Sequence, residues 1–342
     1  MWDPAAAHDA APLTFDPAHG LSANGERAGG CIQCVDAPCT RFTAAEIAVD
    51  VGVDLSCATD TAVCPVDAIT IGPTAAPVIN ADSCIACGLC IARCPVGALS
   101  LSDADRPEVR ILDESSRVPF AGTLASFQAA RSYVADAIAR VHAEQDHLLA
   151  AAEGATAHLS DTSPRSGARP DARRAIGRLV RNTFLALGLP ARLSISGNNS
   201  DPCEFVALLP GGLHLVGEIE SGRDGLDATR RAIAARAVLE ARWGLTPNSL
   251  RPVVVIARVP NLRTDVYRLL DDVHAVLGLD VALVPVASLV AAIYAMDRDA
   301  VIRLFTTADV MPSVDQPSHA FVAAFGDALA DALARAGIAP RK

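Results

Sequence analysis

The stretch from residue 84 to residue 95 constrains this chain more than any other. It contains four cysteines spaced by two, two and three residues, with a proline directly after the last: Cys84, Cys87, Cys90, Cys94 and Pro95. This is the spacing C-x2-C-x2-C-x3-C-P, which is typical of iron–sulfur proteins. Three thiolates two residues apart can lie on one tight loop and hold three irons of a cubane, whereas the fourth points away toward another cluster. The run therefore predicts a second cysteine motif elsewhere in the chain.

A second motif lies upstream. Its cysteines have the spacing C-x2-C-x4-C, followed later by a cysteine with its own proline: Cys31, Cys34, Cys39, Cys64 and Pro65. With the strings CPVDAI and CPVGAL, residues 31–103 resemble a bacterial two-cluster ferredoxin domain, in which the fourth cysteine of each motif crosses to the other cluster. The resemblance implies two [4Fe–4S] clusters. One would be held by Cys84, Cys87, Cys90 and Cys64, and the other by Cys31, Cys34, Cys39 and Cys94.

The chain departs from that family between Cys39 and Cys64, where about two dozen residues replace the usual three. The inserted segment contains an extra cysteine, Cys57. We expect Cys57 to be a free thiol or a neighbour of the ligands, with its replacement of Cys39 or Cys94 as a ligand the alternative. A set of disulfides or a zinc site could also account for so many cysteines, but two overlapping runs ending in Cys-Pro disfavour both.

Charge and composition bound the remaining possibilities. The 342 residues carry a net charge of −10, and nine of the ten cysteines precede residue 95. Residues 171–342 hold 19 Lys and Arg against 18 Asp and Glu, whereas the first 170 residues hold 10 against 21. An acidic cluster domain predicts low reduction potentials, because adding an electron there costs Coulomb energy. The clustered thiolates predict a reducing cytoplasm. The sequence does not begin with a basic segment followed by an apolar core, so we expect no secretory signal. The longest apolar run has only sixteen residues, which predicts that no segment spans a membrane.

The composition along the chain predicts an α+β protein with two folded parts. We expect a flexible extension over residues 1–30, the two-cluster ferredoxin-like domain over 31–103, a helical connector over 121–152 and a Gly/Ser/Pro-rich linker over 153–171. Residues 172–342 form the second domain. Its predicted elements are a helix over 172–187, strands over 191–196, 203–209 and 213–220, a helix over 226–243, a strand over 252–258, a helix over 264–277, a strand over 281–284, a helix from 288 and a last helix over 320–336.

This order of elements predicts an α/β domain with a mixed sheet. On the strand over 213–220, alternation places Glu218 and Glu220 on one face, and Glu204 begins the matching face of the preceding strand. Three neighbouring carboxylates would form a site for a divalent ion, Mg²⁺ or Mn²⁺, and we expect their mutual repulsion to raise at least one pKa.

Together with the element order, the acidic trio of Glu204, Glu218 and Glu220 resembles the restriction-endonuclease-like PD-(D/E)xK fold. That resemblance implies that these residues are catalytic and bind the metal. The position that usually holds lysine is Glu220, and the only lysine of the chain is Lys342. The alternatives are a solvated strand face or an inactive site in a domain kept for binding.

Arginines offer a weaker indication of a nucleic-acid partner. Two groups lie on predicted helices, and the two interpretations are phosphate contact and a solvated helix face. The helix over 172–187 carries Arg173, Arg174, Arg178 and Arg181, and at or within the helix over 226–243 are Arg223, Arg230, Arg231 and Arg236. Three functions remain open from the sequence. They are a nucleic-acid-processing factor for repair or defence, with metal-dependent DNA cleavage as its activity; an electron carrier that docks a redox partner protein; and a non-catalytic subunit of a larger assembly.

Overall fold

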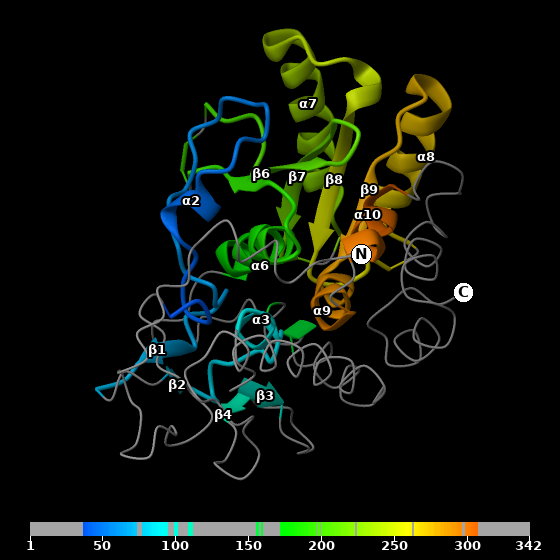
Figure 1. Ribbon diagram of the computed structural model, residues 1–342. Coiled ribbons are helices and arrows are strands. Elements are labelled where there is room, and N and C mark those ends of the chain that lie inside the picture. The colour runs from blue at the N-terminus through cyan, green and yellow to red at the C-terminus, as the bar shows by residue number, and fades with distance from the viewer. Residues whose placement is uncertain are drawn as a thin grey trace.

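The computed structural model describes most of the cysteine-rich region and of the α/β region (Figure 1). The residues described are 37–73, 77–94, 99–101, 109–111, 155, 156, 159, 172–195, 197, 198, 200–222, 224–261, 263–295 and 298–306. The predicted extension over 1–30, the connector over 121–152 and the last helix over 320–336 lie outside these ranges.

A five-stranded mixed sheet forms the centre of the C-terminal region, as the sequence predicts. Its strands lie in chain order: β5 (Ala191–Leu193), β6 (Phe205–Leu209), β7 (Leu213–Glu220), β8 (Leu250–Ile256) and β9 (Ala282–Pro285). The first three pair antiparallel, and β7, β8 and β9 pair parallel. The hairpin between β6 and β7 turns at Pro210 and Gly211, where Gly212 N–H donates to the Leu209 carbonyl and Gly211 has φ +84°. Proline followed by a residue with positive φ is the pattern of a type II turn.

Helices cover both faces of the sheet, and β8 shows why. Val253 and Val255 pack into the core that contains α6 (Ala172–Ala186) and α9 (Val286–Ala295). Val254 and Ile256, the alternate residues, pack against α7 (Leu226–Trp243) and α8 (Asp265–Leu277). A strand buried on both faces needs an unbroken apolar run, which the Val-Val-Val-Ile sequence of β8 supplies.

The cysteine-rich region is built from short elements. They are α2 (Ala44–Ile47), the antiparallel pair β1 (Ile69–Ile71) and β2 (Pro77–Ile79), α3 (Leu89–Ala92), and the antiparallel pair β3 (Leu99–Leu101) and β4 (Val109–Ile111). Thr43 begins α2 with a capping box: its hydroxyl accepts from the Glu46 N–H, and the Glu46 carboxylate accepts from the Thr43 N–H. Two otherwise unsatisfied N–H groups are paired in this way, so one helical turn is stable inside the insertion.

The segment between Cys39 and Cys64 docks on the C-terminal sheet. Cys57 forms an isolated antiparallel bridge with Ser194, just after β5. Val51, Val53 and Leu55 are buried with side chains of β6, β7 and α7. Gly52, at φ +69°, approaches the His214 imidazole so closely that a Cβ atom would be 2.9 Å from Nε2. The insertion therefore continues the α/β core.

The two regions share one hydrophobic core, with α6 between the sheet and α3 (Figure 1). Side chains around the cysteine loops and side chains of α6 and α9 belong to the same buried cluster. Three residues of the predicted linker over 153–171, Ala155, Thr156 and Leu159, are helical and buried. Ala155 and Leu159 belong to this shared core.

In the α/β region several boundaries differ from the sequence-based prediction, and one described α-helix was not predicted. The strand predicted over 252–258 begins two residues earlier, at Leu250. The unpredicted helix, α10 (Arg298–Thr306), follows α9 too closely to be separated from it by periodicity alone. None of the helices within the described ranges is long and apolar enough to cross a bilayer.

Candidate iron–sulfur site

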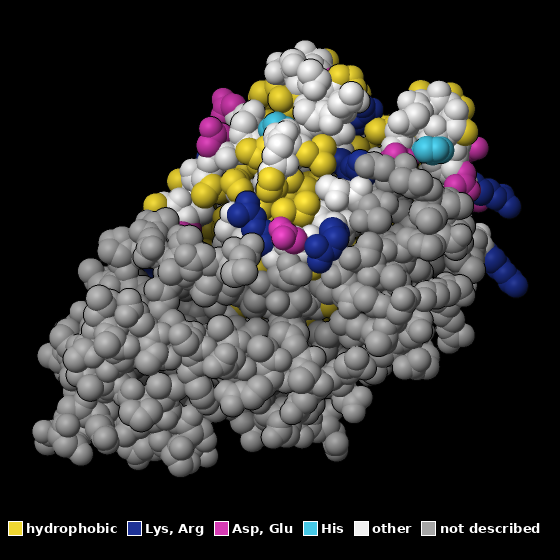
Figure 2. Space-filling model, turned by 45° about the vertical axis from the view of Figure 1, so that its right-hand side comes forward, with side chains coloured by type: hydrophobic (Ala, Val, Ile, Leu, Met, Phe, Trp, Pro, Cys, Tyr) yellow, Lys and Arg dark blue, Asp and Glu magenta, His cyan; other side chains and the backbone are white. Residues whose placement is uncertain are grey.

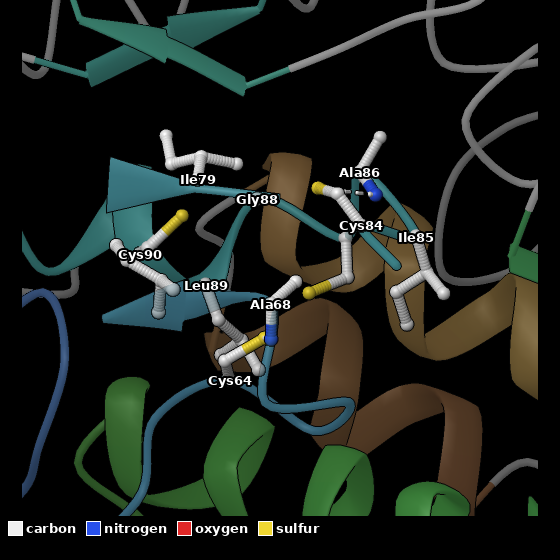
Figure 3. Close-up of a pocket in the computed structure, with 11 residues that line it drawn as sticks. Cys64, Ala68, Ile79, Cys84, Ile85, Ala86, Gly88, Leu89 and Cys90 are labelled. Atoms are coloured by element: carbon white, nitrogen blue, oxygen red, sulfur yellow. Dashed lines mark hydrogen bonds between the residues drawn. The ribbon is translucent and has the colours of Figure 1, made fainter. Parts of the chain in front are cut away.

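Four cysteines line a single pocket in the cysteine-rich region. They are Cys64, Cys84, Cys87 and Cys90, and the remaining lining is almost entirely apolar: Ala68, Ile69, Ile79, Ile85, Ala86, Gly88 and Leu89. Figure 3 shows Cys64 around the same space as Cys84 and Cys90, although Cys64 comes from a separate segment of the chain. The structure therefore brings together the four residues that the ferredoxin resemblance assigned to one cluster.

The loop that carries Cys84 and Cys87 curves around the pocket because two residues adopt positive φ. Ala86 has φ +50° and Gly88 has φ +83°, and Gly88 is the residue before α3. These two left-handed residues flank Cys87 and turn the chain so that α3 can begin immediately and present Cys90. Glycine adopts this conformation at no steric cost, whereas alanine is strained in it.

Backbone N–H groups point at the sulfur atoms. The N–H of Ala68 donates to Cys64 Sγ at 3.1 Å, and the N–H of Ala86 donates to Cys84 Sγ at 3.4 Å. Hydrogen bonds to ligand sulfurs stabilise negative charge on them and raise the reduction potential of an iron–sulfur cluster.

Ionising the thiols in this pocket is costly, because the pocket is buried and the thiols lie close together. Burial raises the pKa of Cys64, of Cys87 and of Cys90, and the charges of neighbouring cysteines add to each rise. Four thiolates in an apolar pocket thus require positive charge from a bound group. Iron supplies that charge, and a pocket with four cysteine sulfurs and an apolar wall fits a [4Fe–4S] cluster.

The second predicted ligand set is described in part. Cys39 is half-buried, Cys94 is buried, and both pack in the shared core. Cys31 and Cys34 lie outside the described ranges. The second cluster therefore stays a prediction.

Cys57 does not line the four-cysteine pocket. Its thiol donates to the Leu55 carbonyl at 3.1 Å and lies 3.7 Å from Nη1 of Arg192. Burial raises the pKa of Cys57. This placement on the bridge to Ser194 agrees with a role as a free thiol.

The acidic trio lies at the end of β7, among arginines. Glu218 is almost fully buried and its Oε2 accepts from Nε of Arg231 at 2.7 Å, while Nη2 of Arg173 lies 3.8 Å from the same oxygen. Arg173 also forms an ion pair with Glu204. Glu204 Oε2 accepts from the Ile219 N–H at 2.6 Å, which fixes it beside Glu218. Two of the three carboxylates are thus brought together, with Arg173 bound to both.

The Oε1 atom of Glu220 accepts a hydrogen bond from the Gly222 N–H at 2.5 Å, two residues further along the chain. All three carboxylates nevertheless act on Arg231: burial lowers its pKa, but the hydrogen bond to Glu218 and the charges of Glu218, Glu204 and Glu220 outweigh that effect, and the pKa is raised. Within the described ranges, no three His, Cys, Asp or Glu side chains are gathered to hold a single metal ion. A cubane is different, since each cysteine binds a different iron.

The expected rise of a carboxyl pKa is found at Glu218. Burial raises its pKa to about 7 and the charge of Glu204 adds to the rise, although the hydrogen bond from Arg231 and the charges of Arg231 and Arg173 oppose it. The direction agrees with the prediction, but desolvation is a larger cause than the repulsion that the sequence suggested.

Two of the arginines predicted to contact phosphate or solvent do neither. Arg178 is 5% exposed and forms ion pairs with Asp60 and Asp67, and Arg181 is 1% exposed. They lie on the side of α6 that packs against the cysteine-rich region. Among the described side chains on the face shown in Figure 2, the basic ones lie beside acidic and hydrophobic ones and form no extended basic surface.

The sequence reasoning did not identify Arg93, Glu46 or Asn182. Arg93 is buried against Phe42 and pairs with Glu46, and Asn182 bonds the backbone just before Cys64. A charged residue inside a cysteine run, between two ligands, is the one signal that could have drawn attention to Arg93.

Comparisons with known proteins agree with the pocket. A family model described as a 4Fe-4S binding domain matches residues 77–100. A protein of Methanocaldococcus jannaschii, described as an uncharacterized ferredoxin, is 32% identical over 73 residues, which are 21% of this chain and 34% of that protein. The similarity thus spans about a third of the relative. No solved structure matches the chain. Pocket, motif and similarity together identify an iron–sulfur, ferredoxin-like region in this protein.

Proposed function

We propose that this protein is an iron–sulfur electron carrier whose ferredoxin-like region is packed onto an α/β domain that docks a redox partner protein. The observation that carries the proposal is the convergence of Cys64, Cys84, Cys87 and Cys90 on one apolar pocket. Bound there, a [4Fe–4S] cluster would accept and release one electron at a time.

Residues around the pocket would set the free energy of adding that electron to the cluster. The apolar wall of Ile69, Ile79, Ile85 and Leu89 keeps water from the sulfurs, which lowers the local dielectric and makes a change of charge more costly. The N–H groups of Ala68 and Ala86 oppose that cost by donating to the ligand sulfurs. A second cluster held by Cys31, Cys34, Cys39 and Cys94 would offer a further site for electron hopping.

The redox partner that the α/β domain docks would also need a contact close to the pocket, and the hairpin of β1 and β2 offers one. Ile69 and Ile79 line the pocket, whereas Thr70 and Val78, which pair on the opposite face of the same hairpin, are exposed, Val78 to 53%. A partner that packs on these exposed side chains would be separated from the pocket by the thickness of one hairpin. Short separations favour electron transfer, so this surface supports the carrier function.

The test is anaerobic purification followed by iron and sulfide counting and electron paramagnetic resonance of the reduced protein. We expect about four iron from the four-cysteine pocket and about eight if the second set also binds a cluster. A Cys87→Ser variant should lose one cluster. Protein that contains no iron and sulfide after anaerobic reconstitution would refute the proposal.

A metal-dependent nuclease, in nucleic-acid processing, repair or defence, is the second candidate. It is favoured by the order of α6, β5, β6, β7, α7 and β8 and by the placement of Glu204 beside Glu218. The ion pairs of Arg173 and Arg231 oppose it, because a divalent ion would have to displace or adjoin two guanidinium groups.

A cleavage assay separates the two candidates. DNA and RNA, single- and double-stranded, are incubated with the protein and Mg²⁺ or Mn²⁺. Cleavage that is lost in Glu218→Gln, while the clusters are retained, would establish the nuclease. Absence of cleavage in the protein with full cluster content leaves the α/β domain as a docking domain or a non-catalytic subunit.

A further inference from the structure

Arg93 is a buried cation inside the cysteine run, and the hydrogen bonds of its side chain reach the upstream segment of residues 38–46. Its Nε donates to the Pro38 carbonyl at 2.8 Å. Its Nη1 and Nη2 donate to the two carboxylate oxygens of Glu46 at 3.0 and 3.3 Å. Its guanidinium carbon lies 3.9 Å from the centre of the Phe42 ring. The planar fork of arginine can make all these contacts at once, whereas a lysine could not.

The partners of Arg93 surround Cys39 along the chain. Pro38 directly precedes it, and Phe42 and Glu46 follow it within seven positions. The segment is itself rigid, because Glu46 also accepts from the N–H and hydroxyl of Thr43 at 2.7 and 3.0 Å. One side chain therefore fixes the loop of Cys39 against the end of α3.

The charges at this contact are balanced and within reach of Cys39. Burial would raise the pKa of Glu46, but the charge of Arg93 and the hydrogen bonds from Thr43 and Arg93 outweigh it and the pKa is lowered. Burial lowers the pKa of Arg93, and the charges of Glu46 and of the Cys39 thiolate oppose that change. Glu46 and Arg93 thus form an ionised pair beside a predicted ligand.

The position of Arg93 in the sequence connects the two predicted ligand sets. Cys90, three residues before it, lines the four-cysteine pocket, and Cys94, directly after it, belongs to the second set with Cys39. Arg93, next to Cys94 in the chain, is thus hydrogen bonded to Pro38, which is next to Cys39.

We propose that Arg93 is a positioning residue for the second cluster: through Pro38, Phe42 and Glu46 it holds Cys39 in place to bind, with Cys94, the same [4Fe–4S] cluster. The inference rests on the proposed function. It also assigns a role to the first part of the insertion, which supplies Phe42 and Glu46 as the partners that the arginine requires.

The test compares three variants with the wild type after identical anaerobic reconstitution. Arg93→Met keeps the length and removes every hydrogen bond and the charge. Glu46→Gln removes only the negative charge and leaves the Pro38 bond and the Phe42 contact. Arg236→Met is the matched control, because Arg236 also bonds a carbonyl, that of Pro247, and pairs with a glutamate, Glu240, but on α7. Iron, sulfide and midpoint potentials are measured for each.

We expect about eight iron in the wild type and in Arg236→Met and about four in Arg93→Met, with the signal of the four-cysteine pocket retained. Glu46→Gln should keep the iron but raise the midpoint potential of one cluster, since the charge of Arg93 is then uncompensated. Full iron in Arg93→Met would overturn the inference. If Arg93→Met does not fold, a Glu46→Gln protein with wild-type potentials would overturn it.

The iron and sulfide content of the wild type distinguishes failure of this inference from failure of the proposed function. Four iron in the wild type would mean that there is no second cluster, which overturns the role of Arg93 and leaves the electron carrier intact. A wild type without iron and sulfide would instead remove the proposed function itself.

Discussion

Asn182 donates a hydrogen bond from Nδ2 to the carbonyl oxygen of Val63 at 2.8 Å, across 119 positions of sequence. The same amide group donates to the Ala62 carbonyl at 2.9 Å. Asn182 is fully buried on α6, and Val63 directly precedes Cys64, which lines the pocket. The central helix of the α/β domain therefore holds the backbone that presents one sulfur to the pocket.

Replacement of Asn182 by leucine should loosen this part of the pocket. The change leaves two buried carbonyl groups without their donor, at a cost of about 1–3 kcal/mol for each. We expect a lower free energy of unfolding in denaturant and faster loss of iron to a chelator. Asn198→Leu is the control, because Asn198 lies on a surface loop and bonds Asp201. Equal rates of iron loss in both variants would contradict a role of Asn182 at the pocket.

Cysteine substitutions test the ligand assignment. Cys87→Ser should lose one cluster, since Cys87 lines the pocket, and should lose much stability because the small domain depends on its metal. Cys57→Ser should retain the wild-type iron content, since Cys57 lies on the bridge to Ser194. Iron and sulfide counting of both variants distinguishes them. A Cys57→Ser protein that loses as much iron as Cys87→Ser would make Cys57 a ligand.

The regular elements and the loop that carries three of the pocket cysteines could be predicted because their signals are local. β7 and α7 begin and end at the predicted residues, since a Pro-Gly-Gly turn precedes the strand and Gly225 and Gly244 flank the helix. Cys84, Cys87 and Cys90 lie within seven positions of one another, and their spacing alone determines one loop.

Contacts between distant segments carry no such signal. Arg93 and Glu46 are 47 positions apart, and nothing in either segment indicates the other. The burial of Arg178 depends on the docking of Asp60 and Asp67 on α6, which a helical pattern alone does not reveal. For the same reason the insertion looked like an addition to a ferredoxin domain, whereas it packs on the sheet.

The pH dependence of stability should report Glu218. Its pKa in the folded protein is about 7, against 4.5 as the ordinary value, so between these values the folded state binds more protons than the unfolded state. Stability therefore falls as pH rises through this window, by roughly 3 kcal/mol in total. In Glu218→Gln the fall should be largely absent. Denaturant unfolding of both proteins from pH 4.5 to pH 8 measures the difference.

Asp60→Asn provides the contrast for this measurement. Burial would raise the pKa of Asp60, but the Ala62 N–H and Arg178 outweigh it and the pKa is lowered. Because the pKa of Asp60 is lower in the folded state, its carboxylate stabilises the folded protein at pH values above the unfolded-state pKa. That stability is lost as pH falls through the folded-state pKa, so Asp60→Asn should change the stability profile at acid pH instead. A Glu218→Gln profile parallel to the wild type between pH 4.5 and 7 would show that Glu218 is ionised there.

Gly217 lies against the ring of Phe205 on the neighbouring strand. They are paired in register between β6 and β7, and a Cβ atom at Gly217 would fall inside the Phe205 ring. The aromatic ring thus covers the glycine of the neighbouring strand, an arrangement that also strengthens cross-strand pairing. Gly217→Ala should force Phe205 out of its place and lower the free energy of unfolding by about 1–3 kcal/mol. Because Glu218 follows Gly217 directly, the variant should also alter the pH profile of stability.

A double-mutant cycle tests whether the ring is the cause. Phe205→Leu alone opens a cavity and should destabilise the protein, but in that background Gly217→Ala meets a smaller side chain and should cost much less than in the wild type. The coupling free energy, taken from chemical denaturation of all four proteins, is expected to be at least about 1 kcal/mol. Additive losses of unfolding free energy would show that glycine is needed at position 217 because of its backbone conformation, and not because the Phe205 ring lies against it.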